Sequence, residues 1–531
     1  MSLRPVRALV AAAAVAALVT TPLTSPTATA ATAATPVAPA TDGGKADRAA
    51  SPAARRAADA VATARAVGAG RKAGDLTMAL RDVANTRDAL TGADRAAADR
   101  LLMRPTAPNG DGNLDYDGAP VTRTCSAVAC VHYVTGAGDA DAASPAYAQN
   151  VLALVTQTSN TYVTAGYRRP KADGNRGGDA RIDVYLGDIG GMGLYGYCAS
   201  DDPSRSTADY SRWAYCALDN DYSRAEFPTN TPLENLQVTV AHEYFHAVQF
   251  AYDRFEDSWL LEATATWVED EMYDSVDDNR QYLRSSQLRR PGTPLDTFDA
   301  TTGFHYGTWS FFRFLSERYP ARRGVLPAIV LEVWQRADGS RGGQRDLYSW
   351  QAVNAVLKRR GTTGAKMLAS YAAANRRPAA SYREGRTYPR APLAGRASMT
   401  PGKTVRAEKR MRHLTSATYR FTPKNLARPS SRLRLALDMA PRFTGSTALV
   451  TTVLTNGKVR TARIFLTKRG NKTKTVPFSS RSVRSVEVTL VNGSGRFECW
   501  RRPYPENPTF SCSGIPKDDR VVNRLTATAV R

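Results

Sequence analysis

The stretch TPLENLQVTVAHEYFHAVQF, residues 231–250, predicts a long helix with a well-marked start. Thr231 can cap that helix, and Pro232 suits the first turn because its missing N–H would have no partner there. Glu234 completes a T-x-x-E capping box, in which the threonine and glutamate side chains each bond the other residue's backbone N–H. The helix is therefore expected to begin at a defined residue, which sets the faces on which its later side chains lie.

The same helix carries two of the chain's five histidines, four positions apart. His242 and His246 lie one turn apart on one face, so that two imidazoles can bind a single metal ion. Glu243 is rotated by about 100° from His242, which makes it a poor third ligand but lets it reach a water molecule beside the metal. The H-E-x-x-H spacing thus predicts a zinc site with a general base next to it. The alternative is that three polar residues share one helix by chance.

A third protein ligand is expected from the next helix, because a catalytic zinc ion takes three protein ligands and keeps a fourth position open. The stretch SWLLEATATWVEDE, residues 258–271, predicts that helix and has Glu262 in its first turn. If the chain turns back at residues 252–258, His246 lies roughly 9 Å and Glu262 roughly 6 Å from the turn. The two side chains then reach nearly the same height. The alternative is that Glu262 is an ordinary solvated helix residue.

These two segments together resemble the gluzincin clan of zinc metallopeptidases. The resemblance lies in HEYFH followed, sixteen residues later, by the glutamate of W-x-x-E-x-x-A-x-W, and it is strongest for residues 181–319. In particular, the chain is similar to the secreted bacterial metalloproteases of the peptidase-MA-like type. The resemblance implies that His242, His246 and Glu262 bind zinc and that Glu243 is the general base.

The resemblance also implies two further kinds of site residue. In this clan a tyrosine or histidine from a later helix stabilises the oxyanion, and GFHYGTW, residues 303–309, offers Tyr306 and His305. Tyr306 is preferred because it matches the Y-G pattern of the similar proteins; the alternative is that both residues only pack between helices. The thermolysin form N-E-x-x-S-D is absent, so Glu269, two turns beyond Glu262, is the candidate partner behind a ligand. A surface salt bridge would use Glu269 equally well.

The segment before the histidine-bearing helix is expected to contact substrate. Residues 214–218 predict a strand, and in gluzincins such a strand is the sheet edge that pairs with the substrate backbone. The stretch GGMGLYG contains no acid to hold a free amino terminus, which favours an endopeptidase. Asp219 and Asp221 are candidate Ca²⁺ ligands, although capping of the next loop is the preferred interpretation. The acidic turn at 109–118 only partly copies a calcium loop, because Thr124 stands where glutamate is required.

The first residues have the composition of a secretory signal. Arg4 and Arg7 precede an apolar run at residues 8–19, and small residues end at Ala30, so residues 1–30 are predicted to be a cleaved signal peptide. That run is too short to cross a bilayer and no later stretch approaches ~20 apolar residues, so no integral membrane segment is expected. The protein is predicted to be secreted and extracellular, with association to the cell envelope as a further expectation.

Residues 31–120 are rich in alanine and arginine and predict a pro-segment or a linker. The first part has the composition of a disordered segment, whereas residues 49–102 indicate two or three helices with thin apolar stripes. A pro-segment that masks an active site and a plain spacer both fit this pattern.

Six cysteines agree with export to an oxidising compartment. They are expected to form three disulfides between near neighbours, namely Cys125 with Cys130, Cys198 with Cys216, and Cys499 with Cys512. Metal binding by the thiolates is the competing interpretation, but the spacing of CSAVAC does not recur in the chain.

The last quarter of the chain carries almost all of its excess positive charge. Residues 401–531 contain 27 Lys and Arg against 7 Asp and Glu, whereas the whole chain has a formal charge of +23. No zinc-finger or RNA-binding signature accompanies this charge, so nucleic acid is not an expected partner. Short runs such as LRLALDM and TALVTTVL, separated by Gly, Asn and Pro, predict a β-sandwich. Its basic surface either binds an anionic cell-wall polymer or only keeps the protein in solution.

The sequence as a whole predicts an α+β protein with two folded domains. Residues 121–395 are expected to form a mainly helical, gluzincin-like catalytic domain with a small antiparallel sheet, and residues 401–531 the basic β-sandwich. The predicted function is a secreted zinc endopeptidase that acts on protein or peptide substrates with Glu243 as general base. Two alternatives stay open: a non-catalytic adhesion protein with a relic metal site, and a zinc hydrolase of a non-peptide bond.

Overall fold

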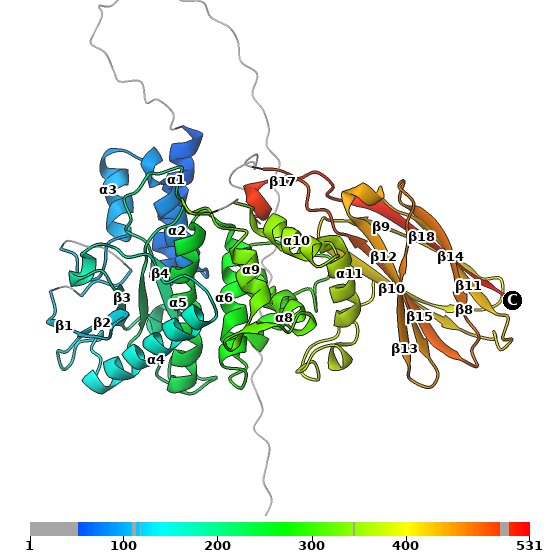
Figure 1. The fold of residues 1–531 in the computed structure, drawn as a ribbon, viewed down its shortest axis with the longest axis horizontal. Coiled ribbons are helices and arrows are strands. Elements are labelled where there is room, and N and C mark those ends of the chain that lie inside the picture. The colour runs from blue at the N-terminus through cyan, green and yellow to red at the C-terminus, as the bar shows by residue number, and fades with distance from the viewer. Residues whose placement is uncertain (1–50, 109–112, 117, 344–345, 500–508) are drawn as a thin grey trace, which may run out of the picture. The chain divides into compact units, whose positions relative to one another are not determined.

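The computed structural model describes residues 51–108, 113–116, 118–343, 346–499 and 509–531 (Figure 1). The predicted signal peptide, residues 1–30, lies outside the described residues, and so do the first part of the predicted pro-segment and part of the acidic turn at 109–118. Helices and strands both contribute substantially to the described chain, so the predicted α+β class is confirmed in its broad form.

A five-stranded mixed sheet lies next to the histidine-bearing helix. In spatial order its strands are β1 (Val121–Cys125), β2 (Ala129–Val134), β3 (Ile182–Gly187), β5 (Tyr215–Asp219) and β4 (Gly196–Ala199). The pairs β2–β3 and β3–β5 are parallel, whereas β1 and β4 run antiparallel to their neighbours. The prediction of an antiparallel sheet is therefore wrong. The parallel pair β2–β3 forms because α4 (Pro145–Thr164) carries the chain back between the two strands, as parallel pairing requires.

The edge of this sheet beside the histidine-bearing helix is β4. Strand β5 pairs with β3 on one side and with β4 on the other, so its backbone is used on both sides. The edge role expected of residues 214–218 is therefore wrong, and β4 has that role among the described strands. A disulfide between the paired residues Cys198 and Cys216 ties β4 to β5.

Helices cover both faces of the sheet. Along β3, Val184 and Leu186 point into the core shared with α4 and α5 (Pro232–Asp253), whereas Tyr185 packs with the N-terminal helices. The helices predicted within residues 49–102 are confirmed as α1 (Pro52–Gly68), α2 (Leu76–Thr86) and α3 (Gly92–Leu101) (Figure 1). The sheet is thus the middle of three layers, with α4 and α5 on one face and the N-terminal segment, residues 51–105, on the other.

The histidine-bearing helix α5 packs against α6 (Ser258–Met272), which follows after a short connection (Figure 1). The predicted capping box of α5 is present. The N–H of Glu234 donates to Oγ1 of Thr231 at 3.2 Å, and the N–H of Thr231 donates to the Glu234 carboxylate at 2.8 Å. Because the connection is short, α6 turns back along α5 and the two helices present facing side chains to each other.

Further helices complete the helix-rich part of the fold: α7 (Phe304–Gly307), α8 (Trp309–Arg318), α9 (Ala328–Trp334), α10 (Ser349–Arg359) and α11 (Gly364–Asn375). Three tryptophans, Trp267, Trp309 and Trp334, are fully buried among them. None of the helices in the described part of the chain is both long and apolar enough to cross a membrane.

Besides a two-stranded sheet of β16 (Phe497–Glu498) and β17 (Ile515–Pro516), the described C-terminal part contains two larger β-sheets. The first has the order β13 (Val459–Ile464), β12 (Ser446–Leu454), β15 (Val483–Asn492), β10 (Thr415–Pro423) and β8 (Gly395–Met399). The second has the order β14 (Asn471–Pro477), β11 (Arg432–Asp438), β18 (Val521–Val530) and β9 (Thr404–Met411). The predicted strand LRLALDM is β11, whose Leu433, Leu435 and Leu437 enter a core shared by both sheets.

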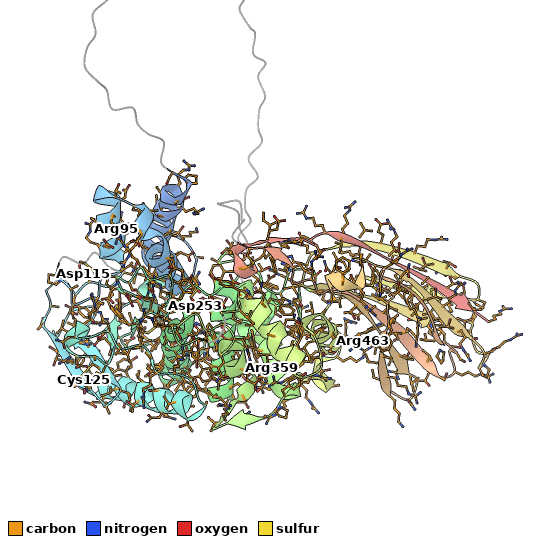
Figure 2. The ribbon with its side chains drawn as sticks, turned by 45° about the horizontal axis from the view of Figure 1, so that its top comes forward. Arg95, Asp115, Cys125, Asp253, Arg359 and Arg463 are labelled. Carbon is orange, nitrogen blue, oxygen red and sulfur yellow. A yellow bond between two sulfur atoms is a disulfide. The ribbon has the colours of Figure 1, made fainter. Side chains whose placement is uncertain are left out.

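Basic side chains project outward from these strands. Figure 2 shows long side chains with nitrogen at their ends on this part of the molecule, Arg463 of β13 among them. Binding of an anionic polymer by residues 401–531 stays a prediction.

A polar joint connects the helix-rich part to the β-sandwich. Oδ1 of Asp296 lies 2.9 Å from Nε2 of His413, and Oδ2 of Asp296 accepts from Oγ of Ser511 at 2.8 Å. Nδ1 of His413 lies 3.1 Å from Asp519, and both Asp296 and His413 are buried. Because these groups satisfy one another away from water, they hold the two parts together with defined geometry.

All three predicted disulfides are confirmed. Cys125–Cys130 joins β1 to β2, Cys198–Cys216 joins β4 to β5, and Cys499–Cys512 links two residues near the C-terminus. Each pair links residues close in sequence, as near-neighbour closure predicts.

Candidate metal centre

Helices α5 and α6 bring the three predicted metal ligands together. Nε2 of His242 lies 3.2 Å from Oε2 of Glu262, and Nε2 of His246 lies 3.2 Å from Oε1 of the same carboxylate. One ligand atom from each of the three residues lies within 4.8 Å of the other two. Tetrahedral zinc with bonds of about 2.1 Å separates its ligand atoms by roughly 3.4 Å. The three side chains therefore need only small movements to share one ion.

Glu269 holds the ring nitrogen of His242 that faces away from this point. Nδ1 of His242 lies 2.5 Å from Oε1 of Glu269. A carboxylate accepts this hydrogen bond, so we assign the proton of the imidazole to Nδ1 and the lone pair to Nε2. The structure thus places Glu269 behind a candidate ligand, where it orients the ring.

Gln249 lies at Nδ1 of His246, as Glu269 does at Nδ1 of His242. Its Oε1 lies 2.7 Å from Nδ1 of His246, while its Nε2 donates to the carbonyl of Leu261 at 2.9 Å and to Oγ1 of Thr264 at 3.0 Å. Because the amide nitrogen is used elsewhere, the amide oxygen must accept from the ring, which leaves the lone pair on Nε2. Both imidazoles therefore present a lone pair to the same point.

Two atoms at that point have no hydrogen-bond partner. Nε2 of His246 and Oε1 of Glu262 are buried without one, even though they lie 3.2 Å apart. With the His246 proton on Nδ1, two lone pairs face each other, which costs free energy unless something lies between them. A cation satisfies both atoms. Two imidazole nitrogens and a carboxylate oxygen form a donor set that suits zinc, so the residues present fit the ion that the resemblance implies.

The charges around the site also favour a cation. Among the described residues that line the site there are five acidic side chains and no lysine or arginine. Burial raises the pKa of Glu243 and raises that of Glu269 to about 7. Burial would also raise the pKa of Glu262, but His246 and its neighbouring histidine hold it well below the usual range. Removing so many carboxylates from water is costly without a positive charge among them.

Glu243 lies on the side of α5 that faces the edge strand β4. Glu243 is only 7 % exposed, and its Oε2 accepts from Oγ1 of Thr77 at 3.4 Å. Gly196 of β4 packs so closely that a Cβ there would lie 2.8 Å from Cγ of Glu243 and 2.9 Å from Cγ2 of Thr239. Glycine at this position therefore lets β4 approach the glutamate. The position of the Glu243 side chain beside the three candidate ligands is suited to a general base and not to a fourth ligand.

Of the two candidates for oxyanion stabilisation, Tyr306 lines the cavity at the site and His305 does not. The Tyr306 ring lies 6.2 Å from the ring of His242, measured between centroids. His305 is fully buried with its ring 4.3 Å from that of Phe298, and burial lowers its pKa to about 4. A hydroxyl that reaches the cavity can meet a substrate, so the geometry favours Tyr306.

The cavity at the site has a volume of about 230 Å³ and is bounded by β4, α5, α6 and the residue Tyr306. Further parts of the wall come from the 3-10 helix Asp278–Ser285, through Asp278 and Tyr282, and from the start of α2 in the N-terminal segment. There, Oδ2 of Asp75 accepts from the hydroxyl of Tyr306 at 3.0 Å. Burial and the nearby Glu262 raise the pKa of Asp75 well above its usual range. The N-terminal segment thus contributes directly to the site.

The two candidate Ca²⁺ ligands have different surroundings. Asp219 forms a potential ligand group with Asp188 and Glu226. Both of its carboxylate oxygens accept backbone hydrogen bonds, from Tyr222 at 2.6 Å and from Gly190 at 2.9 Å. Asp221, the other candidate, accepts from the N–H of Ser223 at 2.6 Å and does not belong to that group. Both aspartates thus stabilise loop structure; calcium binding stays a prediction.

Comparison with known proteins does not identify a family. The chain matches no known family model and no curated protein. Among solved structures, it is similar to the pre-peptidase C-terminal domain of a collagenase from Bacillus anthracis, with 7 % identity, a TM-score of 0.15, and coverage of 26 % of this chain and 96 % of that one. It is also similar to a family GH115 4-O-methyl-alpha-glucuronidase specific for decorated arabinogalactans, with 10 % identity, a TM-score of 0.13, and coverage of 69 % and 54 %. Similarity at this level carries no functional argument.

Among the residues at the site that the sequence-based prediction lacks, three form hydrogen bonds with the predicted side chains. Gln249 lies three positions after His246, on the same side of the helix, and that spacing is a signal that could have found it. Asp75 and Thr77 come from a segment 166 or more residues away from the side chains they contact. No local pattern in the sequence connects positions so far apart.

Proposed function

We propose that the chain is a secreted zinc-dependent endopeptidase. The observation that carries the proposal is the meeting of His242, His246 and Glu262 at one buried point, with lone pairs directed to it and Glu243 beside it. The three disulfides fit an oxidising compartment such as the outside of a cell, which supports secretion.

Each side chain has a defined task in this proposal. Zinc, when bound, would polarise the substrate carbonyl and acidify the attacking water. Glu243 removes a proton from that water and passes it to the nitrogen of the leaving amine, so the carboxylate ends as it began. Tyr306 donates a hydrogen bond to the carbonyl oxygen as it becomes negative. Glu269 and Gln249 keep the imidazole rings in the orientation that this chemistry needs.

The edge strand β4 offers a way to bind an extended peptide. The N–H of Cys198 does not bond β5 but points to the outer side of the strand, where it meets Oγ1 of Thr77. A substrate chain that takes this outer position gains backbone hydrogen bonds and passes Glu243. Because a backbone-pairing mode needs no free terminus, it supports cleavage within a chain.

The test compares the zinc-loaded wild type with Glu243→Gln. We expect both proteins to bind one zinc ion, and we expect the variant to cleave casein at least about 10²-fold more slowly because it lacks the general base. Glu332→Gln, a partly exposed glutamate on α9 that pairs with Arg360, is the matched control and should behave as the wild type. Equal casein cleavage by wild type and Glu243→Gln with zinc bound would contradict the mechanism.

The same measurements separate the two alternative functions. A zinc hydrolase of a non-peptide bond would bind zinc in both forms but leave casein and peptides intact. An adhesion protein with a relic metal site would bind little zinc and show no hydrolysis. Only the peptidase predicts stoichiometric zinc, cleavage of casein and loss of cleavage in Glu243→Gln together.

A further inference from the structure

The start of helix α2 lies inside the proposed active site. Asp75 is the N-cap of α2 and Thr77 belongs to its first turn, yet both line the cavity that contains the metal-ligating residues. They reach the site from the opposite face of the sheet, since the N-terminal segment packs on Tyr197, Tyr215 and their neighbours. The contacts that they make involve the groups that a substrate would need.

Asp75 accepts the hydrogen bond that the hydroxyl of Tyr306 donates. Its Oδ1 accepts from the N–H of Met78 at 2.8 Å, as in a helix cap, while its Oδ2 accepts from Tyr306 at 3.0 Å. A phenol has a single proton to donate. While Tyr306 donates that proton to Asp75, it cannot donate to the carbonyl oxygen of a substrate.

The single hydroxyl of Thr77 forms hydrogen bonds with two more groups that a substrate or the reaction would need. Oγ1 of Thr77 donates to Oε2 of Glu243 at 3.4 Å and accepts from the N–H of Cys198 at 3.0 Å. The first contact stabilises the carboxylate and thus weakens it as a base. The second occupies the outer N–H of β4, the donor that an extended peptide would use.

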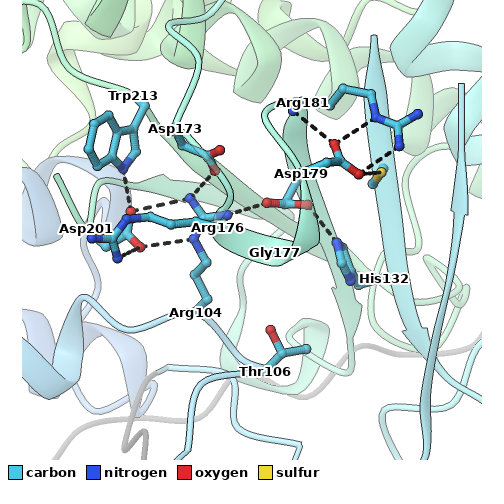
Figure 3. A network of polar contacts seen from close by, with 12 residues as sticks. Arg104, Thr106, His132, Asp173, Arg176, Gly177, Asp179, Arg181, Asp201 and Trp213 are labelled. Atoms are coloured by element: carbon cyan, nitrogen blue, oxygen red, sulfur yellow. Dashed lines mark hydrogen bonds and ion pairs between the residues drawn. The ribbon is translucent and has the colours of Figure 1, made fainter. Parts of the chain in front are cut away.

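The N-terminal segment is held firmly while it makes these contacts. Arg104 bonds Asp173 at 2.6 Å and Asp201 at 3.0 Å (Figure 3). It also pairs with Asp183. Within α2, Arg81 donates to the carbonyl of Glu256 at 2.6 Å, at the turn between α5 and α6. Asp75 and Thr77 are therefore fixed in the cavity by the rest of their segment.

We propose that Asp75 and Thr77 form an inhibitory pair that keeps the site in a resting state by occupying Tyr306, Glu243 and the edge of β4. The proposal rests on the proposed function, because it assigns these three groups to a substrate. The occupant is the chain itself, so a substrate must displace the start of α2 before it can bind.

Two substitutions remove the inhibitory pair without removing the helix. Asp75→Ser keeps a good N-cap but has a side chain too short to reach Tyr306. Thr77→Val keeps the shape of the side chain and loses only the hydroxyl. Asp59→Asn, on an exposed position of α1 in the same segment, is the matched control. Circular dichroism and thermal unfolding show whether each variant is folded.

The experiment uses the full zinc-loaded chain and two readouts. The first is the dissociation constant of acetohydroxamate, a small chelating probe of access to the metal, measured by calorimetry. The second is cleavage of a quenched-fluorescence peptide mixture. We expect each variant to bind acetohydroxamate more tightly and to cleave peptides faster, by on the order of tenfold, the effect of releasing one competing hydrogen bond. Asp59→Asn should match the wild type.

The other possible results each contradict either the inhibitory pair or the peptidase function. Folded variants with unchanged or weaker acetohydroxamate binding overturn the inhibitory pair, whether or not the wild type cleaves peptides. Slower cleavage by Asp75→Ser or Thr77→Val also overturns it, because the residues would then position Tyr306 and Glu243 for the reaction. Tighter acetohydroxamate binding without peptide cleavage in any variant supports the inhibitory pair and overturns the peptidase.

Discussion

The two imidazoles of the candidate metal centre have different groups behind them. His242 bonds a carboxylate, that of Glu269, whereas His246 bonds the neutral amide of Gln249. A carboxylate partner raises the basicity of a ligand imidazole more than an amide does, because its charge stabilises the positive charge that the ring acquires. The single carboxylate of Glu262 faces both rings, so a change in any one of these side chains alters the surroundings of the others.

We predict that Glu269→Gln weakens zinc binding by about 10- to 100-fold, the usual effect of losing such a partner. The variant still has an amide oxygen to accept from Nδ1 of His242, so the ring keeps its orientation and loses only the effect of the charge. Competition with a chromogenic zinc chelator measures the affinity. Glu332→Gln is again the control, and an unchanged affinity in Glu269→Gln would show that Glu269 does not act on the metal.

At the scale of secondary-structure elements, the approach of β4 to α5 decides the position of the proposed base. This approach depends on Gly196, because a Cβ at that position would lie 2.8 Å from Cγ of Glu243. Both elements are themselves fixed: β4 by its disulfide to β5, and α5 by its capping box. A larger residue at position 196 must therefore displace the glutamate side chain.

We predict that Gly196→Ala lowers peptide cleavage by on the order of tenfold or more, since small displacements of catalytic groups are costly. Zinc content should be unchanged, because none of the three candidate metal ligands is among the atoms nearest to a Cβ at position 196. The measurement is kcat/KM on a peptide together with metal analysis. Gly191→Ala is the matched control, because a Cβ there meets only atoms 3.9 Å away. Equal losses in both variants would contradict the prediction.

The capping box of α5 gives a second prediction at this scale. Thr231→Ala removes the side chain that accepts from the N–H of Glu234 and should lower the free energy of unfolding by about 1 kcal/mol. Thermal or urea unfolding measures the change. Thr231→Ser keeps the cap and should restore most of the stability; a loss equal to that of the alanine variant would show that the hydroxyl is not the cause.

At the scale of the whole molecule, the polar joint makes the association of the helix-rich part with the β-sandwich dependent on pH. Burial would lower the pKa of His413, but Asp296 and Asp519 raise it above the usual value. Burial would raise the pKa of Asp296, but His413 and Ser511 lower it. The joint is therefore most stable when His413 is protonated and Asp296 is ionised.

We predict that the stabilisation from the His413–Asp296 contact is greatest in an intermediate pH range and decreases at both higher and lower pH. The part from His413 is fully present below about pH 6.5 and decreases as the pH rises through the raised pKa. The part from Asp296 is present above about pH 3.8 and decreases as the pH falls through the lowered pKa. In His413→Asn the melting temperature should be lower at pH 6 and should depend less on pH as the pH rises above about 6.5. Parallel curves for wild type and variant would contradict the role of His413.

The sequence by itself determined the features that depend on residues close together in the chain. The start of α5 follows from Thr231 and Glu234, and the shared face of His242 and His246 follows from helical spacing. Disulfide pairing, the helices within residues 49–102 and the alternating strands after residue 401 were predictable for the same reason, since turns, caps and periodicity are local properties.

Only the tertiary structure decided which elements lie beside one another. It shows a mixed sheet with β4 at the edge, Gln249 behind His246, and Asp75 and Thr77 inside the site. Sheet order and the Asp75–Tyr306 contact join residues far apart in the chain, up to 231 positions for that contact. Such contacts form because they satisfy the packing of the whole core and the buried polar groups together, and no short stretch of sequence contains that information.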